Sequence, residues 1–118
     1  MIADDANFEE VVSGSPIPVL VDYWATWCAP CRRLGPIVEE LAVEYAGRVV
    51  VAKVDADTNP ASVQRAGVVS IPTLQIMVGG TVVSTLIGAR PRQEIAAALD
   101  GVLAATSGHG GALEGASL

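Results

Sequence analysis

The chain has 118 residues, 51% of them hydrophobic, with 13 acidic and 7 basic residues and a formal net charge of -6. A chain of this length and apolar content forms one domain whose core needs no metal or disulfide to stay folded, and disorder is excluded for most of it. The few basic residues are scattered along an acidic chain, so the composition disfavours binding to nucleic acids or to anionic lipid.

The amino-terminal segment does not resemble a targeting signal. Residues 1–5 lack a basic region followed by a long apolar run, and no stretch of the chain approaches 18 uninterrupted apolar residues. We therefore expect a soluble, cytoplasmic protein with no membrane association.

A short helix and a buried strand are predicted first. Asp4 or Asp5 can cap an amphipathic helix that extends to about Val12. Residues 18–24 are apolar on both alternating faces except for Asp22, which is typical of a central strand covered by helices on both sides.

A helix and a second strand follow. A 3.6-residue apolar period runs from Cys28 to Gly47, with a kink expected at Pro36. Residues 48–55 form another valine-rich strand, and the length of the crossover predicts that the two strands are parallel.

The next elements are a short helix and a hairpin. Asn59-Pro60 is a suitable cap and first position for a helix that ends at Gly67. Residues 73–78 and 81–87 form two antiparallel strands, joined by Gly79-Gly80 in a primed turn.

The last helix opens at Pro91 and has one apolar face, made of Ile95, Leu99, Val102 and Leu103. Residues 105–118 are rich in glycine, alanine and serine, and we interpret them as a flexible tail in which His109 is a solvated bystander. The predicted organisation is one domain over residues 1–104 followed by this tail.

The segment that carries chemistry is Trp27-Cys28-Ala29-Pro30-Cys31, at the point where a strand turns into a helix. Two residues between cysteines in the first helical turn bring the sulfurs close enough to bridge. The first sulfur lies by unpaired N–H groups at the positive end of the helix dipole, which stabilises its thiolate form. We therefore predict Cys28 as the nucleophile and Cys31, one turn further in, as the more shielded sulfur that attacks second.

The segment Val19–Cys31 resembles the active-site segment of thioredoxins. The resemblance covers residues 4–104, because further matches follow in the family's order and approximate spacing, namely Lys53-Val54-Asp55, Asn59-Pro60, Ile71-Pro72-Thr73, Gly79-Gly80 and Gly88. It implies the thioredoxin fold of the α/β class, a central mixed sheet of four to five strands flanked by helices on both faces. It also implies a cis peptide bond at Pro72, opposite the cysteines.

Three positions depart from the family's usual pattern. Ala29 stands where glycine is usual, in the dipeptide that helps to set the reduction potential. Gly79 replaces the usual asparagine, which suits a primed turn. The family's extra first strand is reduced here to Met1 and Ile2, so we expect a shortened edge of the sheet.

Asp22 is a carboxylate inside an apolar strand, where ionisation is costly unless the group has a partner. It is either a solvated edge residue or, in the functional interpretation, it lies beneath Cys31 with a raised pKa and accepts that thiol's proton. Lys53, the only lysine, is either a surface charge or, as the resemblance implies, a charge partner that tunes the pKa of Asp22.

We expect an apolar rim around the reactive sulfur, a surface typical of protein binding. It consists of an exposed Trp27 together with Ala29, Pro30, Ile71, Pro72, Gly88 and Ala89. Pro72 can be a simple turn proline. The resemblance gives it further roles, which are to keep metal from the cysteines and to let the Ile71 backbone pair with an extended substrate.

The leading hypothesis is a protein-disulfide reductase that works by exchange between its Cys-Ala-Pro-Cys dithiol and protein disulfides, and so maintains redox homeostasis. The resemblance implies a thioredoxin reductase that uses FAD and NADPH as partner, with neither cofactor bound to this chain, which we expect to be monomeric. Two alternatives stay open: a zinc or iron–sulfur site shared between two chains, and a binding module whose cysteines are incidental.

Overall fold

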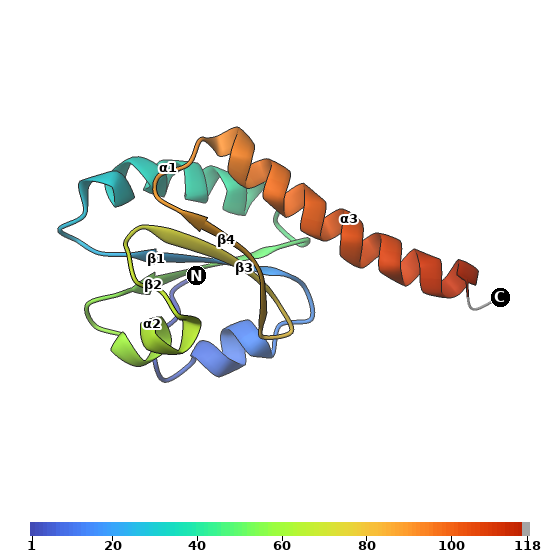
Figure 1. Cartoon of the computed structure of the whole chain (residues 1–118), viewed down its shortest axis with the longest axis horizontal. Helices are drawn as coiled ribbons and strands as arrows, with labels where there is room; N and C mark the ends of the chain where they lie inside the picture. Colours follow the sequence, from blue (N-terminus) through green and yellow to red (C-terminus); the bar gives the residue numbers. More distant parts are fainter. Residues whose placement is uncertain (117–118) are drawn as a thin grey trace.

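A mixed sheet of four strands forms the centre of the molecule (Figure 1). The computed structural model describes the backbone of residues 1–116 and the side chains of residues 1–106. The strands are β1 (Val19–Trp24), β2 (Val50–Asp55), β3 (Thr73–Val78) and β4 (Thr81–Ile87). Their order is β2-β1-β3-β4, with β1 and β2 parallel and the other two pairs antiparallel. The predicted parallel pair, hairpin and mixed sheet are confirmed.

Helices cover both faces of the sheet (Figure 1). On one face lie α1 (Ala29–Glu44) and α3 (Arg92–Ala116), and on the other lie α2 (Pro60–Ala66) and a short π-helix, η1 (Glu9–Ser13). Within the part of the chain that the structure describes, no helix is long and apolar enough to cross a membrane.

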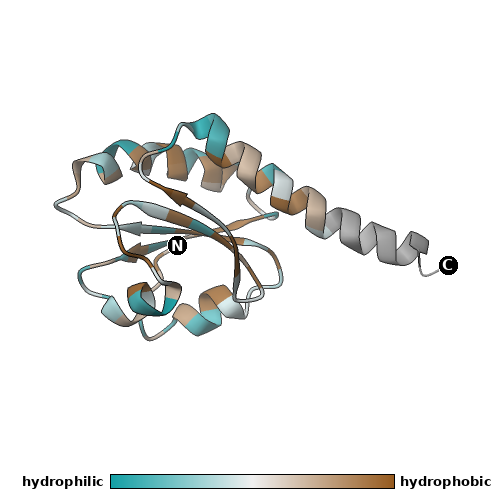
Figure 2. Ribbon diagram, viewed as in Figure 1, coloured by the Kyte–Doolittle hydropathy of each residue, from teal (hydrophilic) through white to brown (hydrophobic). Residues whose placement is uncertain are grey.

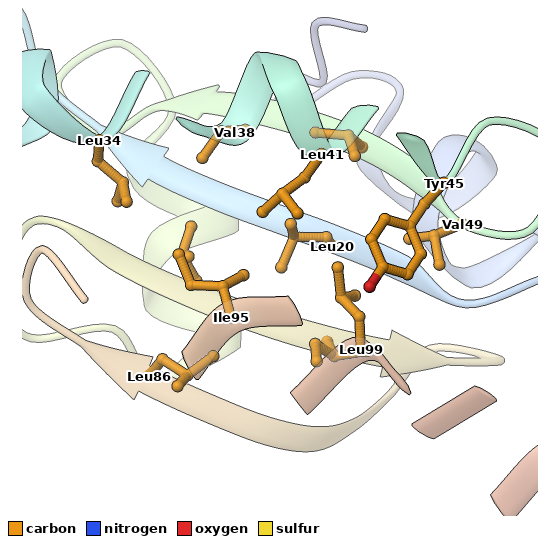
Figure 3. Packing of buried hydrophobic residues seen from close by; sticks show 12 residues of the cluster. Leu20, Leu34, Val38, Leu41, Tyr45, Val49, Leu86, Ile95 and Leu99 are labelled. Carbon is orange, nitrogen blue, oxygen red and sulfur yellow. The ribbon is translucent and has the colours of Figure 1, made fainter. Parts of the chain in front are cut away.

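Alternation along β1 divides its side chains between two apolar cores. Leu20 packs with buried aliphatic side chains of α1 and α3 (Figure 3). Val19, Val21 and Tyr23 belong to the second core, which contains residues of η1 on the opposite face. Asp22 has the parity of Leu20, so it faces the layer of α1 and α3.

The long helix α1 begins immediately after Cys28 and contains Pro36, whose kink stays a prediction. It ends at Glu44, slightly before the predicted end. The reason is that Tyr45 leaves the helical conformation and Gly47 adopts a positive φ of 86°.

The last helix, α3, extends to Ala116 and thus continues past the predicted domain boundary at residue 104. Its first turn is hydrophilic, and its buried side chains, including Ile95 and Leu99, face the sheet as the periodicity predicts (Figures 2 and 3). The flexibility of residues 105–118 stays a prediction, and the side chain of His109 lies outside the described residues.

The two amino-terminal aspartates cap different segments. The Asp4 carboxylate accepts the N–H groups of the two residues at positions 6 and 7, as predicted. The Asp5 carboxylate instead accepts the N–H groups of Ala61 and Ser62 at the start of α2, at 3.3 and 2.8 Å. Asn59 occupies the position before α2, Pro60 begins the helix and Gly67 ends it, as predicted, but the Asn59 side chain makes no capping bond to the described residues of the helix. An ionised carboxylate from elsewhere in the chain satisfies this helix end.

The hairpin and the amino-terminal edge agree with expectation. Gly79 and Gly80 have φ angles of +58° and +84°, which are those of a primed turn. Ile2 pairs with Lys53 of β2 as an isolated parallel bridge, so a single bridge stands at the predicted shortened edge.

Candidate active site

The two cysteines lie where β1 leads into α1. Cys28 occupies the position before the helix, and Cys31 lies in its first turn after Pro30. The two residues form a disulfide, and their Cα atoms are 5.3 Å apart. The Cys28 Sγ accepts a hydrogen bond from the backbone N–H of Cys31 at 3.2 Å. The first sulfur therefore lies at the amino end of a 16-residue helix, where N–H groups and the helix dipole favour negative charge.

Both cysteines are buried in this disulfide form, Cys28 with 3% and Cys31 with 6% of the residue exposed, so the greater shielding of the Cys31 sulfur stays a prediction. The bridge joins both residues into one buried cluster with Ala25, against which Ile71 packs.

A cavity of about 310 Å³ connects Cys31 to Asp22 in the middle of the sheet. Asp22 is 2% exposed, and its Oδ1 has no hydrogen-bond partner among the described residues. Burial raises the pKa of Asp22 from its ordinary value of 3.8 to about 6, while the positive charge of Lys53 acts in the opposite direction. Asp22 is therefore not a solvated edge residue, since β1 has a neighbouring strand on each side.

Lys53 lines the same cavity and lies opposite Asp22 in the register of β1 and β2. No ion pair within 4 Å joins these two described side chains, and the Lys53 ammonium lies 5.2 Å from the centre of the Trp24 ring. The charge of Lys53 therefore lowers the pKa of Asp22 without an ion pair between them. Lys53 is partly exposed, and its role as the charge partner of Asp22 stays a prediction.

Trp24 is a site residue that sequence reasoning missed. It lines the cavity, holds the Lys53 ammonium over its ring, and has a buried Nε1 without a hydrogen-bond partner among the described residues. The signal was available, because Trp24 is two residues after Asp22 and therefore shares its face of β1.

Trp27 is 65% exposed, as predicted. Its indole Nε1 donates a hydrogen bond to Oδ2 of Asp57, at 2.8 Å, in the loop after β2. This contact spans 30 residues of sequence, and no local pattern indicates it.

The structure also brings most of the predicted rim together. Ile71 packs against the cysteine cluster and is joined to Pro72 by a cis peptide bond. The Gly88 N–H donates to the Pro72 carbonyl at 2.9 Å, which places Gly88 and Ala89 beside this loop. Pro72 itself is buried, and its carbonyl accepts the Gly88 N–H, so its predicted place on the exposed rim surface is wrong. Ala29 is exposed and Pro30 is partly exposed.

Comparison with known proteins agrees with this geometry. The family model described as Thioredoxin matches residues 1–101. The chain belongs to the thioredoxin family. It is 47% identical to a thioredoxin of Haemophilus influenzae over 79% of this chain and 87% of that protein. It is 46% identical to a thioredoxin of Alicyclobacillus acidocaldarius over 87% and 97% of the two chains, and 50% identical to one of Allochromatium vinosum over 81% and 90%.

Thioredoxins are dithiol–disulfide oxidoreductases, and this chain has the family's fold together with a cysteine pair that forms a disulfide. It is a protein-disulfide reductase that works by dithiol–disulfide exchange, with proteins as substrates and a reductase as partner. Membership of the family favours the redox interpretation over an incidental cysteine pair. Among the described residues, no group of three Cys, His, Asp or Glu side chains is placed to hold a metal.

Proposed function

We propose that Cys28 and Cys31 carry out the exchange in a fixed order. In the reduced protein, the Cys28 thiolate attacks one sulfur of a substrate disulfide, forms a mixed disulfide and expels the other substrate sulfur as a thiolate. Cys31 then attacks the Sγ of Cys28, which releases the second substrate sulfur and restores the Cys28–Cys31 bridge. The observation that carries this order is the position of the Cys28 sulfur at the amino end of α1.

Asp22 acts as the base for the second step and takes the proton of Cys31 as its sulfur attacks. The shared cavity supports this role, because it gives a route for the proton, either directly or through one water. A carboxyl group whose pKa is about 6 can both accept and return a proton near neutral pH. Lys53 tunes this group, since its charge keeps the pKa of Asp22 below the value that burial alone gives.

The apolar surface around the cysteines is the docking site for protein substrates. The residues that contribute to it are Trp27, Ala29, Pro30, Ile71, Gly88 and Ala89. Pro72, which is buried, is joined to Ile71 by a cis peptide bond and belongs to the same site. The backbone at Ile71 precedes β3, so an extended substrate segment can pair there as an added strand. Apolar contact together with backbone pairing accepts many sequences, as a general reductase requires.

The remaining assignments concern partners and place. We expect the protein to act as a monomer in the cytoplasm and to bind no cofactor of its own. A thioredoxin reductase that carries FAD and draws on NADPH returns electrons to the Cys28–Cys31 bridge.

Insulin reduction coupled to NADPH oxidation by such a reductase tests the proposal. The wild-type chain should turn over, Cys28→Ser should be inactive, and Cys31→Ser should stall as a mixed disulfide that migrates more slowly on a non-reducing gel. Turnover by Cys28→Ser would contradict the order of attack, as would trapping through Cys31 instead of Cys28. Retention of every cellular activity by the double serine variant would support a binding module instead.

A further inference from the structure

One arginine beside the cysteine pair, Arg33, has no electrostatic partner among the side chains that the structure describes. Most basic side chains of this acidic chain are engaged by a carboxylate, a carbonyl or an aromatic ring. Three arginines form ion pairs: Arg65 with Glu9, Arg90 with Glu94, and Arg92 with Glu40 and Glu44. Arg32 donates a hydrogen bond to the Thr26 carbonyl. Arg48 lies over the ring of Tyr45, and Lys53 lies over the ring of Trp24. Among the described residues, Arg33 alone of the basic residues shows no hydrogen bond, ion pair or ring contact. It is exposed, two residues after Cys31.

Arg33 borders a hollow of about 250 Å³ between α1 and the segment that leads into α3. The remaining lining residues are Leu34, Ile37, Ala89, Arg90 and Pro91. The hollow therefore has an apolar lining with guanidinium groups from two elements 57 residues apart. Arg90 is held in place, because it donates to the Ile87 carbonyl and to Glu94.

The hollow continues the proposed docking surface. Ala89 belongs to both, and it follows Gly88, which is hydrogen-bonded to the Pro72 carbonyl next to the cysteine cluster. A substrate segment that crosses the rim toward α3 thus reaches Arg33 within a few residues of its disulfide.

We infer that this hollow is a subsite for an acidic side chain of protein substrates, and that Arg33 makes the chain favour disulfides flanked by glutamate or aspartate. The inference rests on the proposed function, because it assumes that substrates dock on the rim. A guanidinium offers planar N–H donors that match a carboxylate, and the apolar lining suits the methylene groups of a glutamate. A protein with a net charge of -6 otherwise repels acidic partners, so a local cation at the docking site changes which substrates it can approach.

The test uses two synthetic peptides, each with one intramolecular disulfide, that differ only by glutamate or glutamine beside the cysteines. The second-order rate constant for oxidation of the reduced protein is measured for each peptide by stopped-flow tryptophan fluorescence. We expect the glutamate peptide to react about fivefold faster, the factor that an exposed charge pair provides at low salt. Because salt screens exposed charges, this ratio should fall toward 1 at about 1 M salt.

Variants then locate the effect. Arg33→Gln should bring the glutamate-to-glutamine ratio to about 1, Arg33→Glu should invert it, and Arg33→Lys should keep part of it. The control is Arg65→Gln, which removes another exposed arginine, on α2, and should leave the ratio as in the wild type.

The inference is wrong if the wild-type protein shows no preference, if the ratio does not respond to salt, or if Arg33→Gln leaves the ratio unchanged. The same holds if Arg65→Gln abolishes the preference, since the effect would then reflect overall charge. The salt series uses only the wild-type protein, so it tests whether the preference for the glutamate peptide is electrostatic even if a substitution impairs folding. Failure of the proposed function has a different signature, namely peptide reduction by Cys28→Ser.

Discussion

Asp22 is the residue whose chemistry the rest of the site depends on. It lies on the central strand β1, nearly inaccessible to water, and no described residue forms a direct ion pair with it to offset the cost of its charge. A group of this kind contributes more to reactivity than to stability, because ionisation in an apolar setting disfavours the folded state.

Replacing Asp22 by asparagine should therefore stabilise the oxidised protein. The folded protein holds the proton of Asp22 up to a pKa of about 6, and an ordinary aspartate releases it near 3.8. Between these pH values the folded state binds more protons than the unfolded state, so stability falls as pH rises through this window. At pH 7.5 to 8, we expect Asp22→Asn to raise the free energy of unfolding by up to about 3 kcal/mol.

Urea unfolding of the two proteins from pH 4 to pH 8 measures this difference. It should be close to zero at the acid end and should grow as pH rises through 6. Lys53→Met is a second test, because loss of its positive charge should raise the pKa of Asp22 further. The fall in stability that accompanies ionisation of Asp22 should then occur at higher pH than in the wild type. A stability difference that is constant with pH would contradict the raised pKa.

Much of the site could be predicted from the sequence, because several of its residues lie close together along the chain. Cys28 and Cys31 are three residues apart at a strand–helix junction, and Asp22 interrupts an apolar strand, so both features are visible in one window. The place of Trp24 in the site could also have been predicted, because alternate residues of a strand share a face and Trp24 is two residues after Asp22. The packing of Ile71 against the cysteine cluster depends on a distant loop and is not visible in the window that contains the cysteines.

At the scale of elements, the start of α2 shows how tertiary contacts replace local capping. The Asp5 carboxylate accepts bonds from two N–H groups of α2 and from the Ser62 hydroxyl, and the Asp5 N–H donates to the side chain of Asn59. Sequence reasoning assigned the cap to Asn59 because it precedes proline. Asp5 is more than fifty residues away, and no periodicity links the two segments.

Asp5→Asn should lower the melting temperature at neutral pH by weakening this contact. Hydrogen bonds from Ser62 and Ala61 lower the pKa of Asp5, so its contribution is present above pH 3.8 and is lost as pH falls through the lower folded value. The two proteins should thus differ at pH 7 and converge at strongly acidic pH, as followed by circular dichroism. The control is Glu10→Gln, which removes a neighbouring exposed carboxylate in the first turn of η1 and leaves the start of α2 unchanged. An equal loss in both variants would rule out a specific cap.

The β3–β4 hairpin allows a similar comparison between adjacent glycines. Both have positive φ, which costs an alanine about 1 kcal/mol. A Cβ at Gly80 would also lie 2.8 Å from the Ser13 Oγ, whereas one at Gly79 would meet nothing within 4 Å. Chemical denaturation should therefore show a larger loss of stability for Gly80→Ala than for Gly79→Ala, partly recovered when Ser13→Ala is added. Equal losses of stability would mean that a Cβ at position 80 does not clash with Ser13 in solution.

At the scale of the whole molecule, the apolar core and the reactive site share one face of the sheet. One face of β1 carries Leu20 and Asp22 in succession, so the core beneath α1 and α3 passes directly into the cavity under the cysteines. Hydrophobic periodicity predicts this layered arrangement because each element buries one face. What periodicity does not predict is which loops come together at the end of the sheet, where Trp27 is hydrogen-bonded to Asp57 and where Arg33 and Arg90 line the same hollow.

The central claim is that the amino end of α1 holds the Cys28 sulfur as a thiolate near neutral pH. The rate of alkylation of the Cys31→Ser variant by iodoacetamide, measured from pH 5 to pH 10, tests it most directly. If the amino end of α1 stabilises the Cys28 thiolate, the midpoint of the rate profile lies near neutral pH. A midpoint near 8.5, that of a free cysteine, would contradict it.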